Sequence, residues 1–320
     1  MWLLKLPGQP SLQAQLRVPM AADELDTPEQ APLTEPSEQA PTEGEAVEDF
    51  FGTDEIFLRV LATAGHELEQ PLHTFAWGSL AAGLFIGFCF VARATLTAAL
   101  PEGGGRELIG NLLYPIGFIF VILGRYPLYT ENTLTPVTLA LTRFASLPGL
   151  LRVWGVSFSL NLVGAFLFAL LLATTGIFSS SVAETARGFG EHLLDATWAD
   201  AFFKAVLAGW LLAGLVWLVH AARDTIARLI LIWLVIYLQV SADLFHCIVG
   251  SVETLYFVLT GGATFGAYLI EFLLPVALGN TVGGVVFVAV LNYAQFSGGK
   301  GALADYGERL SWRVWLLGAE

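Results

Sequence analysis

The chain is poor in charged residues, which make up 13% of its 320 residues. A typical soluble protein has about a quarter of its residues charged, so this shortage argues against an ordinary soluble domain. Cysteine is scarce, and Cys89 and Cys247 both lie in apolar stretches, so no disulfide framework is expected. No cluster of metal-ligating side chains occurs in these stretches, and the Gly-rich turn at 101–106 lacks the Gly-Lys-Ser/Thr ending of a phosphate loop. No metal, cofactor, nucleotide or nucleic acid is therefore indicated.

Long apolar runs are abundant instead. Apolar residues make up 55% of the chain, and its mean hydropathy is +0.66. A membrane-spanning helix needs about 20 mostly apolar residues. Six stretches qualify: about 74–92, 108–142, 152–173, 202–220, 229–260 and 267–293. The sequence thus predicts an all-α integral membrane protein with six transmembrane helices.

Acidic residues give a formal net charge of −13, and 10 of the 28 lie in the first 50 residues. That segment is rich in Pro, Gln and Thr, so residues 1–50 are predicted to be a disordered tail, either simply solvated or regulatory. Apolar residues at helical spacing then predict an amphipathic cytoplasmic helix at 51–71. Residues 72–296 form the predicted six-helix domain, and residues 297–320 a cytoplasmic C-terminal segment.

Arginine and lysine near the ends of the spans predict the orientation, because cytoplasmic loops carry more of them. With the N-terminus inside, the inner side holds Arg59, Arg143, Arg152, Arg223, Arg228, Lys300, Arg309 and Arg313. The outer loops then hold Arg93, Arg106 and Arg187, and Lys204 lies at the mouth of the fourth helix. This bias predicts that both termini are cytoplasmic.

The second and fifth spans are too long for simple helices, and each has a polar interruption in its middle. In the second span the break covers 124–132 and contains Pro127, which disfavours continuous helix. In the fifth span it covers 241–246 and ends at His246. Irregular backbone and ionisable groups at this depth are tolerated only where they are buried in protein or line a cavity. The breaks therefore predict a pathway with a titratable group inside it.

The chain also contains an internal repeat. An Asn-x-x-Gly motif begins at Asn161 in the third span and again at Asn280 in the sixth, and the two broken spans are likewise three apart. Each half has an odd number of spans, so the halves are expected to be inverted relative to one another. Broken helices at corresponding positions of inverted halves indicate a substrate site near the membrane midplane.

Four short motifs lie at the breaks and in the neighbouring helices. They are Leu-Tyr-Thr-Glu-Asn-Thr at 128–133, Lys204 opening the fourth span, His246, and Leu-Gly-Asn-Thr-Val-Gly-Gly at 278–284. Together they resemble the formate/nitrite transporter family over roughly 75–294, in a less characterised branch. The resemblance implies an aquaporin-like protomer, a homopentamer with one pore per protomer, and a bacterial inner-membrane location. It also implies passage of small monovalent anions such as formate or nitrite.

The resemblance assigns roles to single residues. His246 matches the central pore histidine, Thr130 the threonine of the gating loop, and Lys204 the vestibule lysine that attracts the anion. Asn161 and Asn280 match the asparagines after which their helices pack around the pore. These five residues are the core of the predicted pore.

The narrow parts of the pore follow from the same resemblance. Leu128 matches a narrowing residue of the first break, and Phe118 is a candidate for the same slit. Tyr114 and Gln239 fall where the family has phenylalanines at an outer constriction, so this narrowing is expected to be more polar. Further departures from the family pattern stand at Phe245, Gly250 and Gly209, where other members often have Glu, Asn and Asn.

A weak-acid anion suits these residues. Lys204 offers a positive charge at the mouth, and helix N-termini after the breaks add partial positive charge. The protonated acid crosses an apolar slit far more cheaply than the ion. His246 has an ordinary pKa near neutrality and is suited to pass a proton to the substrate. The sequence therefore predicts proton-linked anion transport and no enzymatic activity.

Simpler roles remain open for these side chains. His246 can bridge carbonyl groups freed by the break, Lys204 can snorkel to the interface, and Thr130 can cap the next helix. Further charges that can tune the pore are Asp243, Glu131, Glu253 and Arg125. The two glutamates are expected to pair with Arg125 or across a subunit interface, or else to make the pore less favourable to anions.

Three other functions are open. A pore for small neutral solutes is favoured by the polar Tyr114 and Gln239, and a transporter-like sensor would use the acidic tail. An intramembrane enzyme would use His246 and Asp243 as base and orienting acid. The enzyme is disfavoured because no nucleophile motif or metal set accompanies these two residues.

Overall fold

The computed structural model describes residues 51–296, 303 and 307–318. Within these residues all regular elements are helices. The acidic tail at 1–50, and the parts of the C-terminal segment at 297–302, 304–306 and 319–320, lie outside the described residues. Predictions about those parts stay predictions.

The helices follow one another with few long connections. The first half contains α3 (Thr53–Glu69), α4 (Leu72–Phe85), α5 (Gly87–Ala98), α6 (Arg106–Gly110), η1 (Asn111–Leu113), α7 (Ile116–Leu123), η2 (Glu131–Thr133), α8 (Thr135–Leu141) and α9 (Leu147–Thr174). The second half contains α10 (Ser180–Asp195), α11 (Trp198–Ala221), α12 (Thr225–Ser241), α13 (Cys247–Leu259), α14 (Phe265–Ala267), η3 (Tyr268–Leu273), α15 (Leu274–Gly284), η4 (Val285–Val290), α16 (Leu291–Gln295) and α18 (Trp312–Leu317).

Five helical stretches are long and apolar enough to cross a membrane. They are Leu72–Ala98, Arg106–Leu123, Leu147–Thr174, Trp198–Ala221 and Phe265–Gln295. The shorter apolar helices α12 and α13 cover the fifth predicted span. The chain is thus an integral membrane protein. It is not helical at 125–129 or at 244–246, inside the two segments where the sequence places the breaks.

Short polar residues set where several long helices begin. The Ser146 hydroxyl accepts a hydrogen bond from the Gly149 amide at the start of α9. The Asp224 carboxylate accepts one from the Ala227 amide, 2.8 Å away, at the start of α12. Such caps satisfy amide groups that have no partner within the helix.

Small residues let two pairs of helices approach closely: α4 packs along α9, and α11 packs along α15. A Cβ added to Gly83 would overlap the Asn161 carbonyl, and one added to Gly209 would overlap the Asn280 carbonyl. Close approach through glycine is common between helices in membranes. It explains why position 209 is glycine: a larger residue has no room there.

Replacing Gly209 by alanine is expected to destabilise the protein by about 3 kcal/mol, because the new methyl group overlaps backbone that cannot easily move. Gly214 on the same helix is the matched control, since a Cβ there meets no atom within 4 Å. Gly214→Ala is expected to gain up to about 1 kcal/mol from helix propensity. Thermal unfolding in detergent compares the two variants, and equal melting temperatures would contradict the packing argument.

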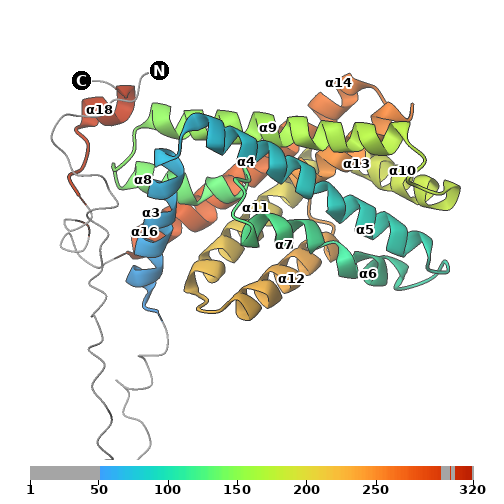
Figure 1. Ribbon diagram of the computed structural model, residues 1–320, viewed down its shortest axis with the longest axis horizontal. Coiled ribbons are helices and arrows are strands. Elements are labelled where there is room, and N and C mark those ends of the chain that lie inside the picture. Colours follow the sequence, from blue (N-terminus) through green and yellow to red (C-terminus); the bar gives the residue numbers. More distant parts are fainter. Residues whose placement is uncertain (1–50, 297–302, 304–306, 319–320) are drawn as a thin grey trace, which may run out of the picture.

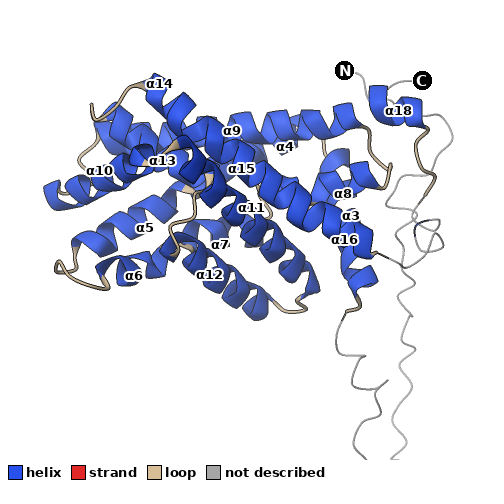
Figure 2. Ribbon diagram, turned by 180° about the vertical axis from the view of Figure 1, so that it is seen from behind, coloured by secondary structure: helices blue, strands red, loops and turns tan. Residues whose placement is uncertain are grey.

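The helices α3, α8, α16 and α18 lie at one end of the molecule, and α6 and α10 lie towards the other (Figure 1). Figure 2 shows the same separation from behind. The Thr135 hydroxyl donates to the Glu67 carboxylate over 3.3 Å, and the Thr63 hydroxyl lies 2.9 Å from His220 Nε2. Burial raises the pKa of Glu67 to about 7. These contacts attach α3 to α8 and α11, and its cytoplasmic position stays a prediction.

Candidate functional site

Asn161 on α9 holds the backbone of the first break. Its side-chain amide donates to the Pro127 carbonyl over 3.1 Å and to the Ser79 carbonyl over 2.7 Å. Its side-chain oxygen accepts from the Tyr129 amide over 2.8 Å. Because Asn161 is fully buried, these bonds satisfy peptide groups that have no access to water.

Asn280 on α15 makes the same three kinds of bond at the second break. Its side-chain amide donates to the Phe245 carbonyl and to the Ala205 carbonyl, each over 2.9 Å. Its side-chain oxygen accepts from the Cys247 amide over 2.9 Å. The two peptide groups that flank His246 in the chain are therefore both fixed by one buried side chain.

His246 and Thr130 meet where the two breaks come together. The Thr130 hydroxyl lies 2.9 Å from His246 Nε2, and both residues are buried. The other ring nitrogen, Nδ1, accepts from the amides of Ile248 and Val249, each 3.2 Å away. An acceptor nitrogen carries no proton, so in the neutral ring the proton is on Nε2 and is donated to Thr130.

These bonds correct two of the simpler roles expected from the sequence. The ring of His246 does not bridge freed carbonyl groups, because its Nδ1 accepts from amides at the start of α13. Thr130 makes no side-chain cap to the helix that follows it. The reasons differ: the helix that follows His246 presents amides, which its Nδ1 accepts, whereas the Thr130 hydroxyl contacts His246 Nε2.

Apolar and aromatic groups surround this contact. The ring of Phe118 meets the ring of His246 edge-on at 5.2 Å between centroids. Leu128 and Phe118 are completely buried, and Tyr114 is nearly so. Gln239 is also buried, and both atoms of its amide lack a hydrogen-bond partner among the described residues. Hence the chain brings Phe118 to His246 but leaves the Gln239 amide unsatisfied.

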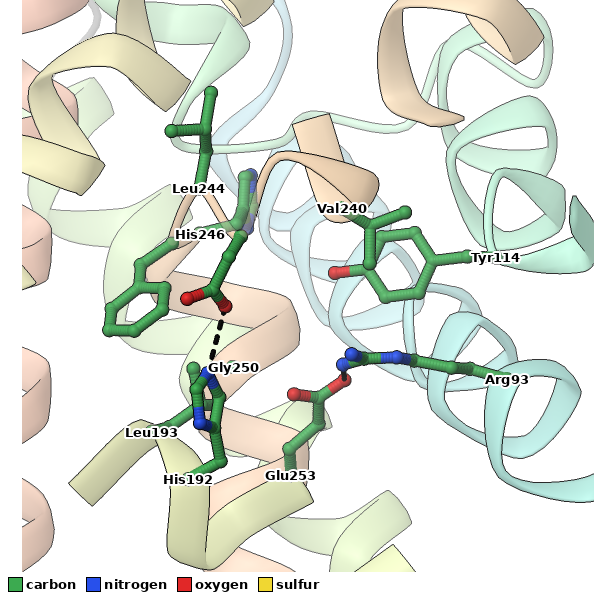
Figure 3. Close-up of a pocket in the computed structure, with 11 residues that line it drawn as sticks. Arg93, Tyr114, His192, Leu193, Val240, Leu244, His246, Gly250 and Glu253 are labelled. Carbon is green, nitrogen blue, oxygen red and sulfur yellow. Dashed lines mark hydrogen bonds and ion pairs between the residues drawn. The ribbon is translucent and has the colours of Figure 1, made fainter. Parts of the chain in front are cut away.

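A small cavity adjoins His246 on the α10 side, and charged side chains are among the residues that line it. Its lining residues are Arg93, Tyr114, His192, Leu193, Val240, Asp243, Leu244, Phe245, His246, Gly250 and Glu253. Gln239 is not among them, and its neighbour Val240 is. Figure 3 shows Arg93 and Glu253 pointing toward one another, with Tyr114 nearby.

The carboxylates that line the cavity are each paired with a basic side chain, Glu253 with the lining residue Arg93 and Asp243 with Lys204, which lies beside the cavity. Lys204 forms a short ion pair with Asp243, and its ammonium lies 4.7 Å from the centroid of the Phe245 ring. The other oxygen of Asp243 lies 2.9 Å from His192 Nε2. Lys204 thus does more than extend to the interface: its charge is held beside the entrance to the cavity.

Glu253 pairs with Arg93, at 3.5 Å between Oε1 and Nη1. Of the alternatives expected for Glu253, this corrects the pairing with Arg125, for which no ion pair is found among the described residues. It also corrects the assignment of Arg93 to an outer loop, because this residue lies within α5 and its side chain is only 12% exposed. Glu253 and the ring of Phe189, 3.8 Å from the guanidinium carbon, offset the cost of burying it.

Glu131 and Asn132 directly follow Thr130 at the end of the first break, in η2. Within the described residues, one carboxylate oxygen of Glu131 and both atoms of the Asn132 amide have no hydrogen-bond partner. Buried polar groups are normally paired, so this region has unused capacity for a water or a polar ligand. In the described part of the chain, no group of three or more His, Cys, Asp or Glu side chains is arranged to hold a metal ion.

Sequence reasoning missed His192 and Arg93 as members of this cavity. His192 lies on α10, a polar helix between two apolar ones, and is 51 residues from Asp243. The sequence around it carries no motif. Arg93 had one usable signal, a charged residue directly following an apolar run, which favoured an interfacial position.

Comparison with known proteins gives consistent matches. The sequence model of the family described as Formate/nitrite transporter matches residues 54–294. The chain is 33% identical over 231 residues to the inner membrane protein YfdC of Escherichia coli (strain K12), covering 72% of this chain and 74% of that protein. It is 31% identical over 252 residues to a probable formate transporter of Methanothermobacter thermautotrophicus, covering 71% of this chain and 90% of that protein. A pentameric formate channel solved with formate bound has the same fold, with a TM-score of 0.60 and 24% identity over 70% of this chain and 97% of that one.

Proposed function

We propose that this chain, which belongs to the formate/nitrite transporter family, is a membrane channel for small monovalent weak-acid anions such as formate and nitrite. The family consists of transporters, and the chain is not an enzyme. The observation that carries the proposal is the buried 2.9 Å contact between Thr130 and His246. It places a titratable group and a hydroxyl together where two helices are broken.

The proposed architecture has six transmembrane helices in two inverted three-helix repeats, with an aquaporin-like arrangement and broken second and fifth helices. The matching bonds of Asn161 and Asn280 support it, because each side chain binds one amide and two carbonyls at corresponding places. The likeness to a pentameric formate channel supports assembly into a homopentamer. The arginine and lysine bias supports cytoplasmic termini, and the YfdC relative supports a bacterial inner membrane.

Transport would begin in the cavity beside Lys204 and Arg93, each of which is paired with a carboxylate and has further N–H groups that can donate to an anion. The substrate then passes the apolar surroundings of Phe118 and Leu128, where a neutral acid is favoured over an ion. A doubly protonated His246 would pass its Nε2 proton to the anion and return to the neutral ring, while the Thr130 hydroxyl offers a hydrogen bond to the substrate. For His246 to take up a second proton, its Nδ1 must give up the amides of Ile248 and Val249, so proton uptake is linked to the geometry of the break.

A pore for small neutral solutes is the second candidate. It is favoured by the pairing of Lys204 with Asp243 and of Arg93 with Glu253, which leaves the four charges in and beside the cavity with a sum of zero. A transporter-like sensor is distinguished by deleting residues 1–50 and measuring flux separately from any cellular response.

The test is a flux panel in liposomes containing the purified protein, with formate, nitrite, acetate, lactate, hydrosulfide and glycerol, each at several pH values. Flux of the anions that increases with an inward proton gradient is the expected result. Glycerol flux that does not depend on pH, together with no anion flux, would support the neutral-solute pore and contradict the proposal.

A further inference from the structure

The acidic and basic side chains in and beside the cavity at His246 cancel in pairs. One further side chain, His192, can change its charge with pH. Lys204 and Asp243 cancel, and so do Arg93 and Glu253. The members of each pair come from different elements, so the balance exists only in the folded chain. Among the other residues that line the cavity, His192 and His246 are the two histidines, the residue type whose ordinary pKa lies near neutral pH, and His192 is the more exposed of them.

His192 is placed to change this balance. Its Nε2 lies 2.9 Å from Asp243 Oδ1, and its side chain is 55% exposed, so protons from the aqueous phase can reach it. The charged groups that face it are Asp243 from the second break, Lys204 from α11, Arg93 from α5 and Glu253 from α13.

The titration of His192 follows from these neighbours. Its helix, α10, is not among the helices long and apolar enough to cross a membrane. The hydrogen bond to Asp243 raises the pKa of His192 above its ordinary value, and this effect outweighs the opposing effects of burial and of the positive charges of Lys204 and Arg93. A raised pKa means that the ring is protonated under mildly acidic conditions and neutral above them.

We propose that His192 controls the capture of small monovalent anions from the side of the membrane that α10 faces. With a neutral ring the cavity carries no net fixed charge, and with a protonated ring it carries one positive charge. The inference rests on the proposed function, because it concerns how the anion enters the same pore. Its ligand class is a small monovalent anion such as nitrite or formate.

The two histidines then act on different steps. His192 sets how tightly the anion is held at the entrance, so it governs the concentration that gives half-maximal flux. His246 acts at the constriction, so it governs the maximal rate. One positive charge at a partly exposed site is expected to change the half-saturating concentration about tenfold, and less at high salt.

The experiment uses the full-length protein in liposomes, with the pH on the α10 side varied from about 5.5 to about 8 around the ordinary histidine range. The pH on the opposite side stays fixed, and initial flux is measured against nitrite concentration. For the wild-type protein, acidification is expected to lower the half-saturating concentration about tenfold. For His192→Gln, this concentration is expected to stay high at every pH. His66→Gln, on an exposed part of α3, is the matched control and should behave as the wild type.

A second variant tests the charge balance without removing the histidine. Asp243→Asn removes one negative charge, and asparagine tolerates the positive φ of 55° at this position. The half-saturating concentration is therefore expected to be low already at the highest pH. This outcome is opposite in sign to that of His192→Gln, so a general loss of folding cannot produce both.

The inference is overturned if His192→Gln keeps the wild-type pH dependence, or if it lowers only the maximal rate. Both results would mean that His192 supports the structure or a later step. If the wild-type protein conducts no anion at any pH, the proposed function fails and this inference fails with it. Flux that is normal in the wild type but unaffected by either variant overturns the inference alone.

Discussion

Replacing His246 by asparagine is expected to lower proton-linked uptake of formate by about 100-fold, the usual contribution of a positioned proton donor. Asparagine is a good residue at the start of a helix, and its side-chain oxygen can accept from the amides that His246 now binds. It has no titratable proton, and it is too short to reach Thr130 as the histidine ring does. The substitution thus removes proton transfer while keeping the helix cap.

Liposome uptake of labelled formate, with and without an inward proton gradient, measures this effect. His73→Asn is the matched control, because His73 is exposed at the start of α4 and far from the breaks in the chain. The variant is expected to keep its melting temperature and to retain slow anion flux that does not respond to the gradient. Wild-type uptake by His246→Asn in a proton gradient would rule out the proposed role.

The positions of the breaks, and of the histidine that ends the second one, could be read from the sequence. A polar segment inside an apolar run is conspicuous, and Pro127 and His246 mark the two places directly. The repeated asparagines at 161 and 280 were also visible, because both breaks need the same backbone groups to be satisfied. These signals lie within short stretches of sequence. They can be recognised because polar residues and irregular backbone are rare inside membrane-spanning segments.

The ion pairs at the cavity could not be predicted from short sequence motifs. Arg93 and Glu253 are 160 positions apart, and each alone looks like an interfacial residue or an unexplained acid. Similarly, position 245 is phenylalanine where many family members have glutamate, yet Asp243 brings a carboxylate to Lys204 through a left-handed backbone turn. Which side chains face each other across helices depends on helix rotation, and short motifs do not specify it.

Gly209 and Gly250, two of the departures from the family pattern, are likewise explained only by packing between helices. A Cβ at Gly250 would overlap the ring of Phe272, just as one at Gly209 would overlap the Asn280 carbonyl. The neighbour that excludes a larger side chain lies on another helix in both cases. A sequence can therefore show that the position departs from the pattern, but only the packing gives the reason.

Replacing Asn280 by alanine is expected to have the largest effect on stability, a loss of about 3–5 kcal/mol, because three buried peptide groups lose their partner at once. They are the Cys247 amide and the carbonyls of Phe245 and Ala205. Their burial within the membrane domain leaves no bulk water to replace the lost bonds. The apparent melting temperature in detergent should fall by about 10 °C for a domain of this size.

Asn280→Asp tests the hydrogen bond that the side chain accepts separately from the two that it donates. Aspartate has nearly the same shape and still accepts from the Cys247 amide, but it has no donors for the two carbonyls and brings a buried charge. It is therefore expected to be at least as destabilising as alanine, and Asn161→Asp is expected to match it at the first break. Asn292→Ala is the control on the same helical stretch, because no side-chain hydrogen bond of Asn292 is found among the described residues. A small effect of Asn280→Asp would mean that the carbonyls find other partners.

The same variants connect stability to transport. Asn280 binds the carbonyl before His246 and the amide after it, so its loss frees the peptide groups that set the direction of the ring. A protein that survives Asn280→Ala should lose gradient-driven uptake to nearly the same extent as His246→Asn, although His246 is still present. Uptake at the wild-type rate in a folded Asn280→Ala protein would show that the histidine does not need this support. The physical argument predicts the opposite, because a proton donor acts only when it is held within hydrogen-bond distance of its acceptor.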